Sequence, residues 1–194
     1  MLIDRILYPV TTLGPGNRIV IWTVGCSKRC YNCANRELWE ANKEKCISPS
    51  ELYDMICKSV NLHEVDGITF TGGDPLEQFD DLYELVTLIA PVVSDILVYT
   101  GYLVSEVQNL IGENKWHQFT DLISVLIDGP YIDEFNDDRC VLRGSTNQNI
   151  IYYDSTIKDK YEKYLLEGRK IQNIYYSDKM ISVGIHDRRK EEQS

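Results

Sequence analysis

The chain has 194 residues, of which 43% are hydrophobic, and its formal net charge is -10 at pH 7. This length fits one domain, since domains typically hold about 100–200 residues, and the negative charge disfavours nucleic acid and anionic membranes as partners. The sequence lacks the run of about 18 apolar residues that a membrane helix needs, and its first residues lack the basic region of a signal peptide, so we expect a cytoplasmic protein.

Strand-like runs alternate with helix-like runs over most of the chain. The predicted strands cover residues 18–24, 67–71, 95–99 and 122–127, and the predicted helices begin at residue 49 and cover 82–89 and 103–111. This alternation predicts βαβ units and a mostly parallel sheet. Four strands are too few for a closed eight-stranded barrel. We therefore expect an α/β fold with a partial barrel that is open on one side.

Two details refine these elements. Strand 18–24 is a near-continuous β-branched and aromatic run, which is typical of a strand buried on both faces. Ser48-Pro49-Ser50-Glu51 is a capping-box pattern with proline at the first helical position, so a helix should begin at residue 49. The buried stripe of that helix is predicted to contain Leu52, Met55, Ile56 and Val60.

The chain divides into a predicted core domain, residues 1–148, and a C-terminal extension, residues 149–194, packed on that core. The extension is rich in Tyr and Lys and contains two β-like segments, at 170–176 and 180–185. Its last residues are highly charged, and we expect them to be disordered.

Three cysteines follow the first predicted strand in a C-x3-C-x2-C loop, at Cys26, Cys30 and Cys33. Thiolates bind zinc, copper(I) or iron–sulfur clusters, and a structural zinc ion or an ordinary cubane cluster takes four protein ligands. Because only three thiols lie close in sequence, the pattern favours a [4Fe–4S] cluster with one iron left open for chemistry. The alternatives are a structural zinc site with a distant fourth ligand, or buried cysteines that act as small hydrophobic residues.

The cysteine loop is the signature of the radical S-adenosylmethionine (SAM) superfamily, which the chain resembles. Gly72-Gly73-Asp74-Pro75 is similar to the superfamily's Gly-Gly-Glu-Pro element. More narrowly, the chain resembles the activating enzymes of anaerobic (class III) ribonucleotide reductase through an ordered set of short blocks between residues 8 and 148. These blocks are Tyr8-Pro9-Val10, Gly14-Pro15-Gly16, the Asn35 to Trp39 spacing, Thr100-Gly101-Tyr102, Asp128-Gly129 and Arg143-Gly144-Ser145-Thr146-Asn147-Gln148.

The resemblance implies both the cofactors and the reaction. SAM binds the open iron through its amino and carboxylate groups, and one electron from the cluster cleaves it to methionine and a 5′-deoxyadenosyl radical. That radical removes a hydrogen atom from a glycine of the reductase. The implied partners are this large glycyl-radical enzyme and an electron donor of the flavodoxin or ferredoxin type.

The resemblance also implies candidate SAM-binding residues at the carboxyl ends of the predicted strands, where ligand sites of parallel sheets gather. Gly72 and Gly73 let the backbone approach a ligand, Asp74 can accept hydrogen bonds from the amino group, and Pro75 completes the motif. Thr100 and Asp128 end the next two strands and are candidates for ribose or carboxylate contacts. The alternative for all of them is an ordinary βα turn.

Inside the cysteine loop the chain departs from the superfamily. The position before the third cysteine is usually hydrophobic and lies beside the adenine, but here it is Asn32, preceded by Tyr31. Both are candidate cofactor contacts, with Tyr31 as an aromatic surface and Asn32 through its backbone. Lys28 and Arg29 are expected to lower the pKa of the thiols.

Two other functions stay open at this point. The same radical chemistry could act on another glycyl-radical enzyme, a ribosomally made peptide or a small molecule, and the extension from residue 149 motivates this alternative. A non-catalytic zinc-binding interaction module is the alternative from another class. Cys46, Cys57 and Cys140 are scattered along the sequence and predict no second cluster.

Overall fold

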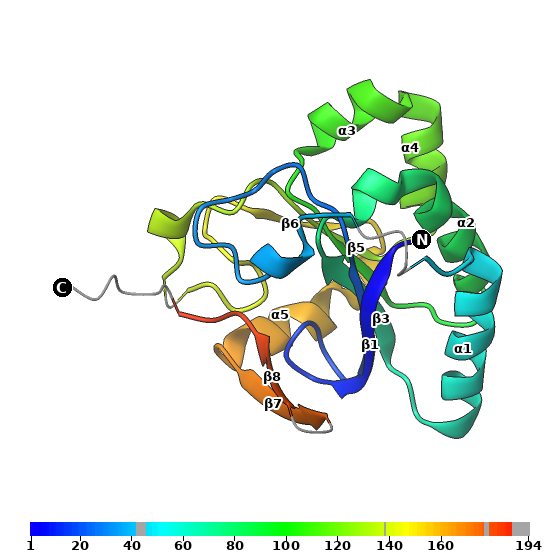
Figure 1. Cartoon of the computed structure of the whole chain (residues 1–194), viewed down its shortest axis with the longest axis horizontal. Helices are drawn as coiled ribbons and strands as arrows, with labels where there is room; N and C mark the ends of the chain where they lie inside the picture. Colours follow the sequence, from blue (N-terminus) through cyan, green and yellow to red (C-terminus); the bar gives the residue numbers. More distant parts are fainter. Residues whose placement is uncertain (42–45, 138, 177–178, 188–194) are drawn as a thin grey trace.

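The structure is a computed structural model that describes residues 1–41, 46–137, 139–176 and 179–187. Its centre is a six-stranded sheet in the order β1-β2-β3-β4-β5-β6 (Figure 1). The strands are β1 (Ile3–Val10), β2 (Arg18–Thr23), β3 (Gly67–Gly72), β4 (Ile96–Tyr99), β5 (Val125–Asp128) and β6 (Asn149–Tyr152). β2 to β5 run parallel, whereas β1 and β6 pair antiparallel at the two edges. The predicted α/β class and mostly parallel sheet are confirmed, and the partial barrel stays a prediction.

The strand predictions hold best in the middle of the sheet. Every residue of β2 is buried, as predicted for a strand covered on both faces. β1 was not predicted, because its sequence mixes charged and apolar residues and only its two end residues are buried. β6 was not predicted either, and it extends the main sheet past the predicted domain boundary at residue 148.

Four helices cover one face of the sheet: α1 (Pro49–Leu62), α2 (Phe79–Ile89), α3 (Val104–Ile111) and α4 (Glu113–Thr120). α1 begins with the predicted capping box, in which Ser48 Oγ accepts from the Glu51 N–H at 3.2 Å and the Glu51 carboxylate accepts from the Ser48 N–H at 3.1 Å. Leu52 and Ile56 face the core, but the predicted burial of Met55 is wrong, since its side chain is 47% exposed. No helix among the described residues is long and apolar enough to cross a membrane.

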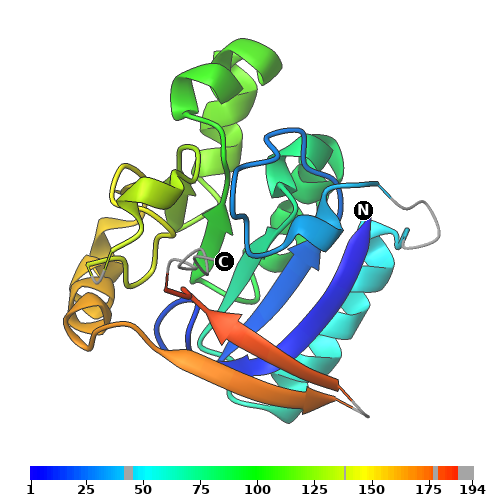
Figure 2. The same ribbon diagram turned by 60° about the vertical axis from the view of Figure 1, so that its left-hand side comes forward.

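The other face of the sheet carries α5 (Lys158–Leu166) and a hairpin of β7 (Ile171–Tyr176) and β8 (Lys179–Gly184). Figure 2 shows the hairpin in front of β1 and β2. Apolar residues of the hairpin join those of β2 in one buried layer, and Tyr161 and Tyr164 of α5 join those of β4 and β5 in another. The described part of the extension therefore packs on the sheet. The end predicted to be disordered is the final eight residues, 187–194, and all of it except Asp187 lies outside the described residues.

A buried charge network closes the amino ends of the parallel strands. Arg18 is fully buried, and its guanidinium lies 3.0 Å from the Asp95 carboxylate and donates to Thr69 Oγ1 at 2.7 Å. α5 supplies two further donors to Asp95, the Tyr161 hydroxyl at 2.7 Å and the Lys160 ammonium at 2.9 Å. Burial opposes ionisation of Asp95, but Arg18 and its hydrogen-bond donors outweigh that effect and lower its pKa.

Candidate functional site

The loops that follow the parallel strands surround one cavity of about 810 Å³. Cys26, Cys30 and Cys33 all line it, as do Gly72, Gly73 and Thr100 from the ends of the next two strands. The sequence predicted the cysteines, Asp74, Thr100 and Asp128 at one rim from their positions after strands. Of these, the cysteines and Thr100 line the cavity, whereas Asp74 and Asp128 do not.

Backbone hydrogen bonds hold the cysteine loop in shape. Its first residues pair with the segment that follows the loop, through Gly25 N–H to the Leu38 carbonyl at 2.8 Å and Cys26 N–H to the Trp39 carbonyl at 3.0 Å. Arg29 and Asn32 have positive φ angles of 45° and 55°. Asparagine adopts this left-handed conformation more readily than a branched hydrophobic residue. The backbone therefore gives a physical reason for Asn32 at this position.

Backbone N–H groups point at the sulfurs. The Asn35 N–H lies 3.4 Å from Cys33 Sγ. Burial raises the pKa of the Cys26 thiol, and hydrogen bonds from the N–H groups of Arg29 and Lys28 oppose that rise. Donors of this kind stabilise a thiolate, which is the form that binds metal.

The Cys30 thiol has a similar environment. Burial raises its pKa, the Tyr131 N–H opposes the rise, and Lys28 is a smaller opposing influence. The predicted lowering influence of Lys28 is therefore present at Cys30, but burial outweighs it and the pKa of this thiol is raised. The charges of Lys28 and Arg29 lie beside carboxylates, with Lys28 Nζ 3.1 Å from Glu106 and Arg29 2.5 Å from Glu40.

The donor set fits an iron–sulfur cluster. A [4Fe–4S] cubane takes thiolate ligands at its corners. Three thiols lie around one cavity, with N–H donors beside Cys26 and Cys33. Among the residues described, no group of three or more Cys, His, Asp or Glu side chains lies close enough to hold one metal ion.

Gly72 and Gly73 line the cavity and are in close contact with neighbouring backbone atoms of the protein. A Cβ on Gly73 would lie 2.2 Å from the Gly25 carbonyl oxygen, and one on Gly72, where φ is +111°, would lie 2.5 Å from the Thr23 nitrogen. The missing side chains let the end of β3 pack directly against the start of the cysteine loop, where Gly73 N–H donates to the Thr23 carbonyl at 2.8 Å.

Asp74 is buried and lies outside the residues that line the cavity. Its carboxylate accepts from the Thr100 hydroxyl at 3.0 Å, the Gly101 N–H at 2.8 Å and the Leu76 N–H at 3.0 Å. Burial raises its pKa to about 6, although the three hydrogen bonds oppose the rise. Asp74 thus ties the loop after β3 to the loop after β4, and its predicted contact with SAM stays a prediction.

The remaining predicted residues take different positions. Asp128 is buried and accepts from the Val104 N–H at 3.0 Å and the Asn149 side-chain amide at 2.7 Å, so it fixes the start of α3 and of β6. Pro75 is buried at the start of a short 3-10 helix. Asn32 lines the cavity, whereas Tyr31 is 62% exposed and stands outside the lining residues, as do Pro75 and Asp128.

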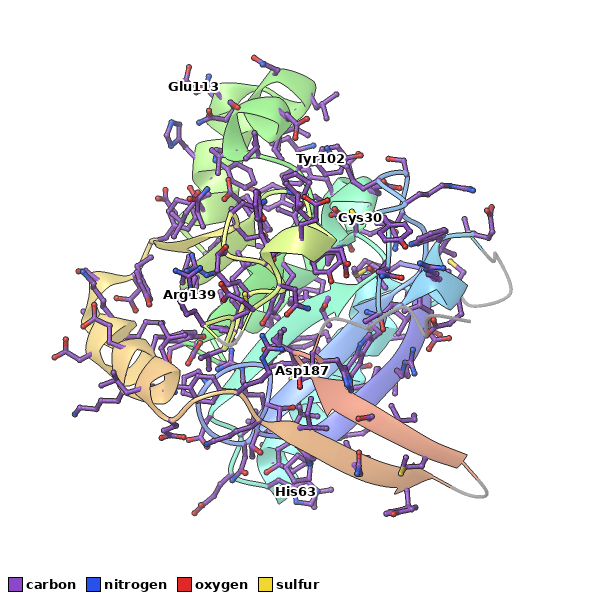
Figure 3. The ribbon with its side chains drawn as sticks, turned by 90° about the vertical axis from the view of Figure 1, so that its left-hand side faces the viewer. Cys30, His63, Tyr102, Glu113, Arg139 and Asp187 are labelled. Atoms are coloured by element: carbon purple, nitrogen blue, oxygen red, sulfur yellow. The ribbon has the colours of Figure 1, made fainter. Side chains whose placement is uncertain are left out.

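The cavity has a second wall that the sequence did not predict. Residues 180–187, which form most of β8 and the segment after it, line the cavity opposite the cysteine loop. Figure 3 looks onto the face that the hairpin covers, with Cys30 and Asp187 labelled. Tyr131, Gly144 and Gln148 also line the cavity. The two β-like segments of the sequence predicted the strands of the hairpin, but nothing local in the sequence indicates where a hairpin docks.

The chain is similar to a protein family in sequence and to a solved structure over part of its length. The profile of a family described as 4Fe-4S single cluster domain matches residues 12–151. A solved structure, QueE from Escherichia coli, aligns with a TM-score of 0.43 at 19% identity over 51% of each chain.

Three relatives carry one name, anaerobic ribonucleoside-triphosphate reductase-activating protein. The protein from Escherichia coli K12 is 33% identical over 148 residues, which is 73% of this chain and 92% of the relative. The protein from Salmonella typhimurium is 34% identical over 73% of this chain and 92% of the relative. The protein from Enterobacteria phage T4 is 30% identical over 76% of this chain and 91% of the relative. The chain therefore belongs to the family of anaerobic ribonucleoside-triphosphate reductase-activating proteins, enzymes with a single [4Fe–4S] cluster domain.

Proposed function

We propose that this protein cleaves S-adenosylmethionine reductively at a [4Fe–4S] cluster and so generates a glycyl radical on an anaerobic ribonucleotide reductase. One observation carries the proposal: the three thiols of the C-x3-C-x2-C loop line a single cavity together with the ends of the neighbouring parallel strands. The shared name of the relatives supports the choice of target.

Cys26, Cys30 and Cys33 are the proposed cluster ligands. When bound, a cluster of this kind supplies the single electron that cleaves SAM. The protein holds the thiols on a loop fixed by backbone hydrogen bonds, and N–H groups beside the sulfurs stabilise their ionised form. With three protein ligands, one iron is left for SAM.

The proposed SAM contacts come from the same cavity. Asn32, Gly72, Gly73 and Thr100 line it directly, which supports their proposed role in binding and orienting the cofactor. Asp74 fixes Thr100 by accepting its hydroxyl hydrogen at 3.0 Å, so its role in this structure is to position the cavity wall. The other proposed contacts, Tyr31, Pro75 and Asp128, lie outside the lining residues.

We further propose that the parallel strands β2 to β5 form the open, partial barrel of a radical SAM enzyme. The helices on one face of the sheet and the cavity at the strands' carboxyl ends support this proposal. The proposed partners are a large glycyl-radical enzyme as target and a flavodoxin- or ferredoxin-type protein as electron donor.

The test is anaerobic reconstitution with iron and sulfide, followed by reduction in the presence of SAM and of the anaerobic reductase encoded by the same genome. We expect equal amounts of methionine and 5′-deoxyadenosine, together with a glycyl-radical signal in electron paramagnetic resonance. Cleavage of SAM without a radical on the reductase would contradict the proposed target. Binding of zinc in place of iron would contradict the chemistry itself.

A further inference from the structure

We propose that the β7–β8 hairpin is part of the docking surface for the protein target, and that it contacts the extended segment of the target that carries the reactive glycine. This inference rests on the proposed function and adds the surface that recognises the substrate. The hairpin lies after Ile151, where the matched part of the family profile ends, so the activity shared by the family assigns it no role.

The hairpin is fixed in place at its strand ends near the β1–β2 loop. The Gln172 side chain donates to the Pro9 carbonyl at 2.9 Å and accepts from the Thr11 N–H at 3.0 Å. The Thr12 hydroxyl donates to the Val183 carbonyl at 3.0 Å, and this bond is buried. These bonds engage both strands of the hairpin, so its position over the sheet is defined.

The segment after β8 is held by a second set of contacts. Arg169, which is mostly buried, lies 2.6 Å from the Asp187 carboxylate and donates to the Cys140 carbonyl at 3.0 Å. The Asn136 side-chain amide donates to the His186 carbonyl at 3.0 Å. The stretch that lines the cavity, residues 180–187, is therefore anchored in its middle at Val183 and at its end at His186 and Asp187.

The hairpin has an apolar inner face and an outer face on which apolar side chains flank the exposed pair Asn173 and Ser182. Ile174, Ile181 and Val183 pack toward the sheet in one buried layer. The opposite face exposes Ile171 at 46%, Tyr175 at 79% and Met180 at 56%.

Tyr175 and Met180 are directly paired across the two strands. Exposed tyrosine and methionine are typical of protein interfaces, where they supply adaptable contact area. In this hairpin they form a small apolar surface next to the cavity.

This surface continues into the cavity. Met180 and Ile171 belong both to the exposed face and to the cavity lining, and the cysteine loop forms the opposite wall. A target glycine must come close to the SAM site, so a protein segment that enters beside β8 contacts the hairpin on its way. Extended segments commonly bind along the side of an existing strand. The geometry therefore favours an extended segment of a protein as the occupant.

The first test uses crosslinking. A photoreactive benzoylphenylalanine is placed at position 175 or 180, and the matched control is position 110 on α3, where Leu110 is 71% exposed and lies outside the cavity lining. After illumination of the reconstituted enzyme with the anaerobic reductase, we expect covalent adducts with the reductase from positions 175 and 180 and none from position 110. Adducts only between two copies of this chain would overturn the proposal.

The second test uses kinetics. The double variant Tyr175→Ser/Met180→Ser is expected to raise the KM for the reductase by about tenfold, since truncating central interface residues commonly has an effect of this size. Leu110→Ser should stay within about twofold. If the KM is unchanged and adducts are absent, the docking role is overturned. Radical formation by the wild-type enzyme in the same experiment would uphold the proposed function. A wild-type enzyme that forms no radical on the reductase would instead refute the proposed function, and the docking role with it.

Discussion

Two buried aspartates, one at each end of the parallel strands, have opposite electrostatic environments. Asp95 at the amino ends is 3% exposed and lies beside Arg18 and Lys160, and its pKa is lowered. Asp74 at the carboxyl ends is 1% exposed and accepts hydrogen bonds from neutral donors, among them Thr100 and Gly101, and burial raises its pKa to about 6. The ionised form of the aspartate is thus favoured at the amino ends and disfavoured at the carboxyl ends.

The difference separates stability from function. At the amino ends, α5 covers the sheet and supplies donors to Asp95, so the polar groups there are satisfied within the protein. At the carboxyl ends, the thiols and strand-end residues border a cavity. Groups that face a cavity keep bonding capacity for a ligand, whereas groups in a closed network do not. Four experiments test this contrast, beginning with the largest expected effect.

Replacing a cluster ligand should abolish chemistry with little effect on folding. We expect Cys30→Ala to reduce bound iron and SAM cleavage by more than about 100-fold, since even changes beyond the ligands commonly lower metal affinity or activity by about 10–100-fold. The free energy of unfolding of the cluster-free protein should change by about 1 kcal/mol or less, because the side chain is only partly buried. The matched control is Cys57→Ala in α1, which should keep its iron. Retention of iron by Cys30→Ala would refute the ligand assignment.

Breaking the network at the amino ends should instead lower stability and have little effect on the chemistry. Arg18→Met leaves Asp95 buried without its main cation, and loss of one partner of a buried ion pair commonly costs about 3–5 kcal/mol. Lys158→Met is the control, since the pair between Lys158 and Glu162 on α5 is exposed and contributes about 0–1 kcal/mol. Urea unfolding of the cluster-free proteins measures the loss of unfolding free energy in both variants. Similar losses in the two variants would show that the buried pair contributes no more to stability than the exposed pair.

The two aspartates should give opposite pH dependences of stability. As pH rises above 3.8, the unfolded Asp74 carboxyl ionises first while the folded one keeps its proton until about pH 6, so rising pH favours unfolding. Over this window wild type should lose roughly 3 kcal/mol relative to Asp74→Asn, from a shift of about two pKa units. Asp95→Asn should show the opposite sign, because the lowered pKa of Asp95 stabilises the folded state above the unfolded pKa. Unfolding free energies between about pH 4 and pH 6.5 measure the slope for Asp74, and unfolding free energies below about pH 4 measure the slope for Asp95. Parallel slopes for wild type and Asp74→Asn would contradict the environment described for Asp74.

The smallest expected effect compares two tyrosines on α5. The Tyr161 hydroxyl donates to the charged Asp95 at 2.7 Å, whereas the Tyr164 hydroxyl donates to the neutral Thr11 carbonyl at 3.1 Å. We expect Tyr161→Phe to cost about 1.5–3 kcal/mol and Tyr164→Phe about 0.5–1.5 kcal/mol of unfolding free energy. Thermal or urea unfolding at pH 7 measures the difference, and an equal cost for both would weaken the case for a charged network.

Local sequence predicted much of the sheet and the core of the site. Continuous β-branched runs defined β2, the capping box defined the start of α1, and the spacing of Cys26, Cys30 and Cys33 indicated a cluster before any fold was known. Each of these signals lies within a few residues of the feature that it predicts, which is why local patterns were sufficient.

Other features depend on contacts that are distant in sequence. Asp74 has the appearance of a ligand-binding residue in a turn, yet its partner Thr100 lies in the loop after β4, and only the folded chain shows where the carboxylate points. Met55 fits a helical stripe by spacing but lies at its edge, where the core does not reach. The position of the hairpin over the cavity depends on Gln172 meeting Pro9, a contact across almost the whole chain.

The closed network at the amino ends also bears on how the chain folds during synthesis. Arg18 and Asp95 belong to strands that emerge early, but Lys160 and Tyr161 belong to α5, which is made late. Until α5 has been translated, the sheet holds a charge pair at a partly uncovered end, without two of the donors that satisfy Asp95. The core is therefore completed only once α5 has been made, and ribosome-bound fragments that stop before α5 should be markedly easier to digest with protease than chains that include it.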